Sequence, residues 1–135
     1  MSKKIYHASG KRKHSIARAT LKPGTGKVRI NNKILDYYGD ELLRMKIMEP
    51  LILAGNEIVS QVDIDVNLRG GGISSGTEAA RLAISRALVE YSGKKVLREK
   101  FLQYDRNLLV ADVRRNEPHK PNDSKPRAKR QKSYR

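Results

Sequence analysis

Cysteine is absent from the 135-residue sequence, which excludes disulfide bonds, thiolate zinc sites and thiol nucleophiles. The three histidines, His7, His14 and His119, do not have the spacing of metal ligands, so we expect no zinc site. No apolar run approaches the ~20 residues that a membrane-spanning helix requires, and Met1–Ile5 lacks the apolar core of a signal peptide. We therefore predict a soluble, cytosolic protein with no cofactor and no membrane partner.

Acidic residues are scarce and unevenly placed. Fourteen Asp and Glu stand against 29 Lys and Arg, which gives a net charge of +15. Residues 1–30 carry nine bases and no acid, residues 114–135 carry nine bases and two acids, and the stretch between them has a net charge of −1. A solubilising surface usually mixes both signs, so binding to a polyanion is the better explanation. Because nucleic acid is the densest polyanion that a soluble protein commonly meets, we predict nucleic-acid binding.

Three segments have the pattern of β-strands. Ser15–Leu21 and Gly26–Ile30 are expected to form a β-hairpin, because residues 22–26 (KPGTG), which join them, contain a proline and two glycines that suit a turn. Two asparagines at positions 31 and 32 mark a second turn. Gln61–Leu68 is the clearest strand, since its apolar residues alternate with acidic and amide ones. This alternation is typical of a half-buried sheet.

A first helix is expected in the middle of the chain. Asp40 is placed to cap a helix that continues through Ile47, and Gly55 is a plausible end for it. Pro50 should interrupt this helix or begin a new helical turn, because proline lacks the backbone N–H that the helix needs. Near the end of the body, Leu108–Val113 has the composition of a last strand.

The longest predicted helix follows a glycine-rich stretch. Ser75 and Glu78 have capping-box spacing, so the helix is expected to begin there and to run to about Tyr91. Small residues on its apolar stripe indicate close packing on a sheet. A shorter amphipathic helix follows, with an apolar stripe from Leu97 to Tyr104. We expect both tyrosines to lie in the core.

The glycine-rich stretch is also a candidate phosphate site. Gly71 and Gly76 have the glycine spacing of a P-loop, but Thr77 stands where that motif needs lysine, and the dinucleotide fingerprint fails as well. Two compatible interpretations remain: a tight strand-to-helix connection, and a nest of backbone amides that contacts an RNA phosphate. Asp63 and Asp65 could hold a metal ion or serve acid–base chemistry, but a solvated strand face is the simpler explanation.

The C-terminal segment, residues 114–135, is unlike the rest of the chain. Its only apolar residues besides proline are Ala128 and Tyr134. Such a segment cannot offset the ~1–2 kcal/mol of backbone entropy that each ordered residue loses, so we predict that it is disordered when free. Its three prolines favour extended backbone, and at ~3.1 Å per residue it could reach several tens of ångströms. Tyr134 has no core to join, which favours stacking on a base or ribose.

Three segments, in the same order, resemble one known family. Residues 10–26 resemble the N-terminal hairpin of the small-subunit ribosomal protein S9 family, residues 70–88 (GGGISSGTEAARLAISRAL) look like its signature, and residues 125–135 are similar to its tail. The match runs from Tyr6 to Arg135. The family's bacterial members usually have glutamine near Thr77 and end in Ser-Lys-Arg, whereas this chain ends in Ser-Tyr-Arg. The sequence is therefore identified as an archaeal-type member.

The resemblance implies an α+β fold: a four-stranded mixed sheet with helices packed on it, a left-handed β-α-β crossover and an extended basic tail. Because sequence reasoning alone favours right-handed crossovers, only the resemblance supplies the hand. We expect one globular rRNA-binding domain over residues 1–113, with a basic N-terminal hairpin, and the tail over residues 114–135.

The resemblance also implies a structural, non-enzymatic protein of the small ribosomal subunit in the cytoplasm. Its partners would be small-subunit rRNA in the head, neighbouring head proteins and the P-site tRNA, which the tail would reach through Tyr134 and Arg135. The alternatives are a free RNA-binding chaperone, since the RNase P protein has a similar fold, and a small-molecule kinase of the same fold group. The residues expected to bind rRNA are Lys11, Arg12, Lys13, His14, Arg18, Arg69, Gly71, Gly72, Arg114, Arg115, Lys120, Lys125, Arg127, Lys129, Arg130 and Lys132.

Overall fold

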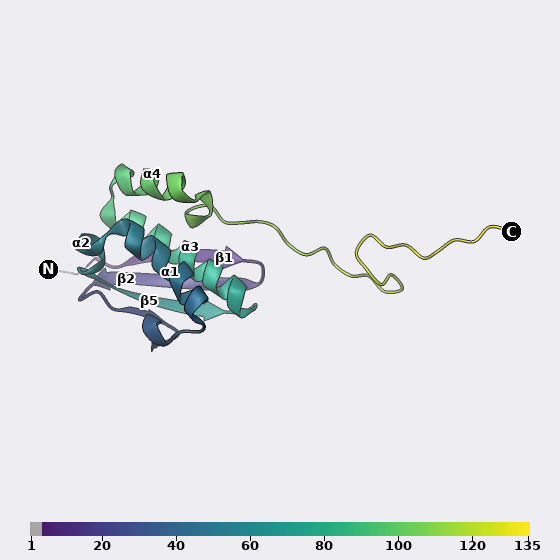
Figure 1. Ribbon diagram of the computed structural model, residues 1–135, viewed down its shortest axis with the longest axis horizontal. Helices are drawn as coiled ribbons and strands as arrows, with labels where there is room; N and C mark the ends of the chain where they lie inside the picture. Colours follow the sequence, from purple (N-terminus) through teal and green to yellow (C-terminus); the bar gives the residue numbers. More distant parts are fainter. Residues whose placement is uncertain (1–3) are drawn as a thin grey trace.

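A computed structural model describes residues 4–135 and shows a layered α+β body from which the C-terminal segment projects (Figure 1). Helices pack on one face of a β-sheet, and the longest of them lies directly against its strands. The strands are β1 (Tyr6–Arg12), β2 (Ser15–Pro23), β3 (Val28–Ile30), β4 (Lys33–Ile34) and β5 (Val62–Arg69). The α-helices are α1 (Glu41–Ala54), α2 (Asn56–Val59), α3 (Ile73–Ser92) and α4 (Lys95–Tyr104), with short 3₁₀ turns at Leu35–Tyr37 and Arg106–Leu108.

The sheet has five strands in the order β1-β2-β5-β3-β4, so the expectation of four strands is wrong. The additional strand is the two-residue β4, which pairs with β3 across the turn at Asn31 and Asn32. Both asparagines have positive φ values, 48° and 68°, which asparagine tolerates better than most residues. The sheet is mixed, because β3 runs parallel to β5 and the other pairs are antiparallel.

The hairpin predicted between Ser15–Leu21 and Gly26–Ile30 is wrong, because β5 lies between β2 and β3 and pairs with both. The connection between the two strands passes around the start of β5. The Asp63 carboxylate accepts hydrogen bonds there from the backbone N–H groups of Thr25 (2.8 Å) and Lys27 (3.0 Å). The turn-forming residues therefore lie in a loop that passes around a third strand, and not in a hairpin turn.

The N-terminal hairpin is formed by β1 and β2, which pair from Tyr6 with Leu21 to Arg12 with Ser15. β1 also packs against α3 at unusually short range. A Cβ atom added at Gly10 would lie 2.2 Å from the carbonyl oxygen of Ala79, which only glycine avoids. The sequence pattern did not indicate β1.

The helices mostly follow the predicted pattern. In α3 the alanine-rich stripe is buried, and it packs on β1, β2 and β5 as expected. Pro50 does not interrupt α1; it is buried inside the helix, where burial offsets its missing hydrogen bond. Gly55 ends the helix with a φ of 88°, which confirms the predicted stop.

Three other local predictions are wrong. α3 begins at Ile73, with Gly72 as its N-cap, so Ser75 lies inside the first turn; its hydroxyl accepts a hydrogen bond from the Gly72 N–H at 3.1 Å. Leu108–Val113 forms no strand, because Leu108 is buried at the end of a 3₁₀ turn and the next residues are irregular. Tyr104 is 57% exposed, whereas Tyr91 is half-buried and packs against the core.

Candidate nucleic-acid interface

The tip of the N-terminal hairpin carries basic side chains that are exposed to solvent. Lys11, Lys13 and His14 are all exposed there, and Lys13 takes a φ of 52° in the turn between β1 and β2. None of the three side chains makes a hydrogen bond or an ion pair within the described part of the chain, residues 4–135. The geometry therefore leaves this tip exposed, and its contact with an anionic partner stays a prediction.

The glycine run packs against this hairpin tip. A Cβ atom at Gly70 would lie 2.6 Å from the carbonyl oxygen of His14, and one at Gly71 would lie 2.0 Å from Ser15 Oγ. The two glycines have φ values of 74° and 66°, which L side chains rarely adopt. These contacts support the interpretation as a tight strand-to-helix connection. Gly71 and Gly72 are exposed, so contact with a phosphate stays a prediction.

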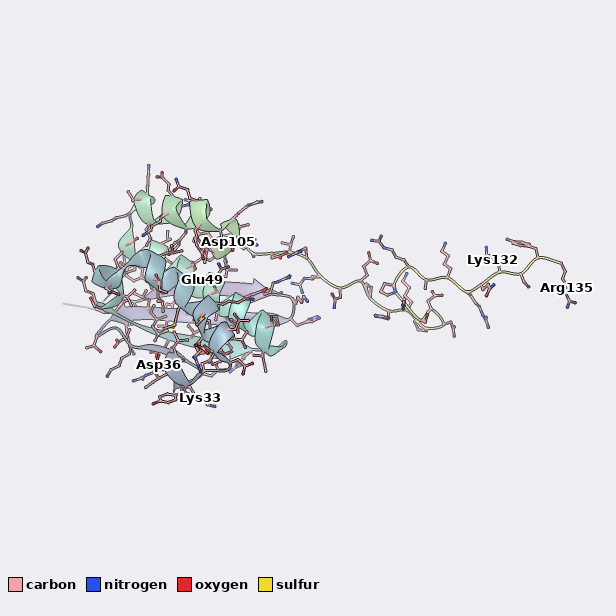
Figure 2. All side chains as sticks on the ribbon, viewed as in Figure 1. Lys33, Asp36, Glu49, Asp105, Lys132 and Arg135 are labelled. Atoms are coloured by element: carbon pink, nitrogen blue, oxygen red, sulfur yellow. The ribbon has the colours of Figure 1, made fainter. Side chains whose placement is uncertain are left out.

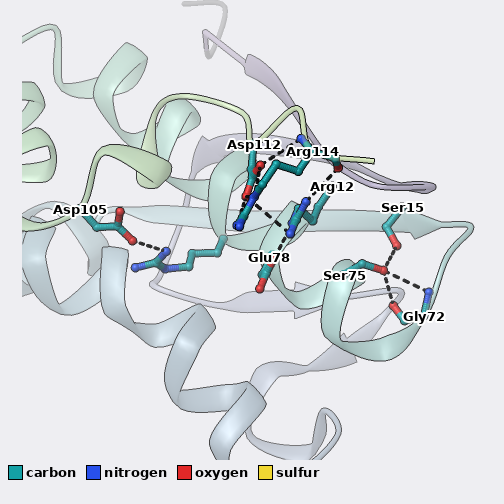
Figure 3. A network of polar contacts seen from close by, with 9 residues as sticks. Arg12, Ser15, Gly72, Ser75, Glu78, Asp105, Asp112 and Arg114 are labelled. Carbon is teal, nitrogen blue, oxygen red and sulfur yellow. Dashed lines mark hydrogen bonds and ion pairs between the residues drawn. The ribbon is translucent and has the colours of Figure 1, made fainter. Parts of the chain in front are cut away.

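Ser15 links the hairpin tip to the strand-to-helix connection at the glycine run (Figure 3). Its side chain is fully buried, and its hydroxyl donates to the Gly70 carbonyl at 3.0 Å and shares a hydrogen bond with Ser75 at 2.7 Å. Because a buried hydroxyl without partners is costly, these bonds fix the hairpin tip relative to α3. The sequence pattern did not single out Ser15.

Arg12 is placed differently from its neighbours at the tip. Its guanidinium pairs with Glu78 of α3 at 2.7 Å and with Asp112 at 3.5 Å, and it donates to the carbonyl of Arg114 at 3.2 Å (Figure 3). Only 14% of this side chain is exposed. Arg12, which the resemblance assigned to rRNA, therefore holds the segment that leads into the tail.

We call residues 109–115 the tail root. Asp112 receives two-pronged hydrogen bonds from Arg114, at 2.6 and 3.0 Å, which hold the pKa of that carboxyl far below its usual value. Arg115 donates to the carbonyl of Lys13 at 2.9 Å, so the root is tied to the hairpin tip. From α3, Arg86 donates to the carbonyls of Leu109 (3.1 Å) and Ser9 (2.8 Å). These contacts set where the tail leaves the body.

A second ion cluster lies beside the tail root. Arg81 of α3 pairs with Asp105 at 3.0 Å and with Glu49 of α1, at the edge of a polar cleft of about 310 Å³. Sequence reasoning missed Arg81 and Arg86, and it also missed the role of Asp112. An available signal was their position: both arginines interrupt the otherwise apolar and small face of α3.

The tail proper, residues 116–135, extends away from the body without helix or strand (Figures 1 and 2). Its main internal contact is the ion pair of Arg127 with Glu117, in which Nε lies 2.9 Å from a carboxylate oxygen. Tyr134 is 88% exposed. The remaining predicted RNA-binding side chains of this segment are all exposed: Lys120, Lys125, Lys129, Arg130, Lys132 and Arg135.

Other kinds of site find little support in residues 4–135. No group of three His, Asp or Glu side chains in that range gathers closely enough to hold a metal ion. Asp63 serves instead as a backbone acceptor, and the N–H groups of Lys27 and Thr25 lower the pKa of its carboxyl. In the same range, no helix has the length and apolar character needed to cross a bilayer.

An α+β body with exposed basic side chains at a hairpin tip and along a projecting tail is typical of a class of small basic proteins that are suited to contact with a polyanion. The comparisons with known proteins identify the family within that class. The family described as ribosomal protein S9/S16 matches residues 10–135. This chain belongs to that family.

Curated relatives extend the match over nearly the whole chain. The small ribosomal subunit protein uS9 of Methanococcus maripaludis (strain C5) is 56% identical over 134 residues, which cover 98% of this chain and 99% of the relative. The protein of the same name from Methanococcus vannielii is 54% identical over the same shares of the two chains. These archaeal relatives confirm the archaeal-type resemblance. The family also confirms the predicted class, a non-enzymatic ribosomal protein.

Proposed function

We propose that this chain is a structural constituent of the small ribosomal subunit in the cytoplasm, where it binds rRNA of the head and sends its tail to the P site. The observation that carries this proposal is the separation of charge. The cations of the hairpin tip and of residues 116–135 are exposed, whereas Arg12 and Arg81 of the body are engaged by carboxylates. Family membership and the names of the relatives agree with this setting.

The tail suits a role between RNA helices. Phosphates that approach one another as helices pack repel each other, and a flexible run of Lys and Arg neutralises them. At the end of the chain, Arg135 offers a charged planar fork of donors that suits a tRNA phosphate. Tyr134 carries no charge, and its exposed ring is suited to stacking on a base or ribose.

Three expectations from the sequence enter this proposal. We take residues 1–113 as the folded rRNA-binding domain and residues 114–135 as the tail, in line with the end of regular structure at Leu108. The crossover from β3 through α1 to β5 is taken as left-handed, as in the family. Neighbouring head proteins are taken as further partners, because apolar side chains such as Leu42 and Ile52 of α1 are 68% and 73% exposed.

Deletion of Lys125–Arg135 tests the role of the tail. The described contacts between tail and body end at Arg115, so the truncated chain should keep its folded body and enter small subunits. Its subunits should retain P-site tRNA less well than wild-type subunits, as measured by filter binding. A deletion that leaves tRNA retention unchanged refutes contact with tRNA. The matched control is Arg98→Gln on the exposed side of α4, which should leave retention unchanged.

Co-sedimentation distinguishes this proposal from a free RNA chaperone of similar fold. A ribosomal protein should stay with small subunits at moderate salt, whereas a chaperone should dissociate from them. On naked RNA, neutralisation of ~6 phosphates by the tail predicts a slope of log affinity against log salt near −4 to −5. The shallower slope expected of the truncated chain gives an internal check.

A further inference from the structure

One face of the sheet is open to solvent, because the helices cover the other. Burial alternates along β2 and β5: Ala17, Ala19 and Leu21 are buried toward the helices, and the intervening side chains point away. We call the uncovered side the open face and define it by Lys11, Arg18, Arg29, Asn67 and Arg69, all of which are exposed.

The strand register brings these residues together. Arg18 of β2 stands opposite Asn67 of β5, and Ile16 of β2 stands between Lys11 of β1 and Arg69 of β5. Since neighbouring strands lie about 4.8 Å apart, side chains in one row are within reach of a single ligand. The basic residues of the open face therefore form a group, although they are far apart in the sequence.

The four cations that define the open face have no carboxylate partner within the described residues. Within residues 4–135, Lys11, Arg18, Arg29 and Arg69 make no ion pair. The two carboxylates on this face have other partners. Asp63 accepts hydrogen bonds from backbone N–H groups, and Asp65, which stands opposite Arg29, pairs at 3.1 Å with Lys22, a further exposed cation of this face. By contrast, the half-buried Arg12 and Arg81 on the helix side are paired with carboxylates. An exposed group of unpaired guanidiniums calls for an anion from outside the chain.

The surface around these cations is hollowed. A groove of about 450 Å³ is lined by Arg18, Arg29 and Asn67, by the Lys22-paired Asp65, and by other residues. On the other side of Arg18, a smaller hollow of about 90 Å³ is lined by Ile16, Arg18, Asn67 and Arg69. Arg18 and Asn67 thus stand between two depressions, and Ile16, which is 40% exposed, gives the smaller one an apolar lining.

We propose that the open face binds an unpaired RNA strand, with Arg18 and Asn67 at the centre of the site. This inference rests on the proposed function, in that it assumes an RNA partner. A guanidinium can donate two parallel hydrogen bonds to one phosphate, and its planar group can also stack on a nucleobase. The Asn67 amide offers both a donor and an acceptor to a base edge or a 2′-hydroxyl. A duplex presents its bases only within its grooves, so a flat face with small hollows fits splayed nucleotides better.

Binding of a fluorescein-labelled 12-nucleotide oligouridylate to the full chain tests the site. The double variant Arg18→Gln/Arg29→Gln should lose about 10-fold or more in affinity, and its salt slope should fall by about 1.4 because two phosphate contacts are lost. The matched control Lys95→Gln/Arg98→Gln removes the same charge from the exposed side of α4 and should lose less than about 3-fold. Equal losses in the two variants would mean that only net charge matters, and would overturn the proposal.

Asn67→Ala tests whether the open face binds RNA through specific contacts or only through its general positive charge. Because no charge changes, affinity should fall about 3-fold or more while the salt slope stays the same. An unchanged affinity, or tighter binding of wild type to a blunt RNA duplex of the same length than to the oligouridylate, would contradict the proposal. Circular dichroism should show that all these variants keep the wild-type fold, since each changed side chain is exposed.

Assembled subunits distinguish this inference from the proposed function. Failure of the wild-type chain to enter small subunits would refute the proposed function itself. If it enters, a photoreactive benzophenone side chain at position 18 should cross-link to unpaired nucleotides, and one at position 98 should not. Cross-links from position 18 that fall on duplex RNA or on protein would overturn the open-face site alone.

Discussion

Gly10→Ala should disrupt the contact between β1 and α3. A methyl group at this position would lie 2.2 Å from the carbonyl oxygen of Ala79 and 2.8 Å from the backbone nitrogen of Ala83. Both atoms belong to the backbone of a 20-residue helix, so no side-chain rotation relieves the clash. The strand and the helix must separate by about 1 Å, a gap that forfeits a quarter to a half of the dispersion energy at each contact.

The expected cost follows from this separation. Overpacking of a core costs 1–3 kcal/mol and occasionally more, and Gly10 sits at a backbone contact, so we expect a loss of about 3 kcal/mol in the free energy of unfolding. For a body of this size, that corresponds to a fall in Tm of about 10–20 °C. Urea denaturation followed by far-ultraviolet circular dichroism measures the loss.

Gly72→Ala provides the control for this measurement. Gly72 has a φ of −100°, and a Cβ atom there meets no other atom within 4 Å. The change alters only the N-cap of α3, which should cost about 1 kcal/mol or less. If Gly10→Ala destabilises the protein no more than Gly72→Ala, the close approach of β1 and α3 is not a constraint on the fold, and the reasoning fails.

Two further predictions concern carboxylates. Asp63→Ala removes the acceptor that holds the loop before β3 and should cost about 1–2 kcal/mol in urea denaturation. Because folding lowers the pKa of Asp63, the stabilising effect of its carboxylate is present above the unfolded pKa of about 3.9 and is lost as the pH falls through the folded value. The difference in unfolding free energy between Asp63→Ala and the wild type should therefore shrink below about pH 4. A difference that stays constant with pH would contradict this prediction. Asp112→Asn should weaken the pair with Arg12 that holds the tail root to β1 and the pair with Arg114 inside the root. Hydrogen exchange should then be faster at residues 109–115 and unchanged in α3; equal exchange in the two proteins would show that the root is held by other contacts.

Elements with a strong local pattern were predictable from the sequence. The alternation in β5 and the alanine-rich stripe of α3 each depend on residues close together in the chain, and each pattern has one period. The stop at Gly55 and the turn at the two asparagines follow likewise from the conformations that these residues tolerate. The exposure of the basic side chains in the tail could be predicted from composition alone, because this segment has too few apolar residues to form a core.

Strand pairing and the tail root were not predictable in this way. Whether β2 pairs with β3 or with β5 depends on where a strand some 40 residues later is inserted, and no local rule contains that information. In the sequence, Arg12 cannot be distinguished from its exposed neighbours Lys11 and Lys13. It differs from them because it pairs with Glu78 and Asp112, which only the fold brings near. The open face likewise exists only once the register of three strands is known.

The central position of β5 also governs the order in which a newly made chain can mature. The strands β2 and β3 gain their shared partner only when residue 69 has been synthesised, and Gly10 meets α3, which ends at Ser92. An isolated β1–β2 hairpin is at best marginally stable in water. About two thirds of the protein must therefore emerge before its cationic N-terminal quarter has a stable scaffold, and throughout that interval this quarter is exposed to any RNA nearby. The basic extension is made last, so it emerges next to a body that can already be folded.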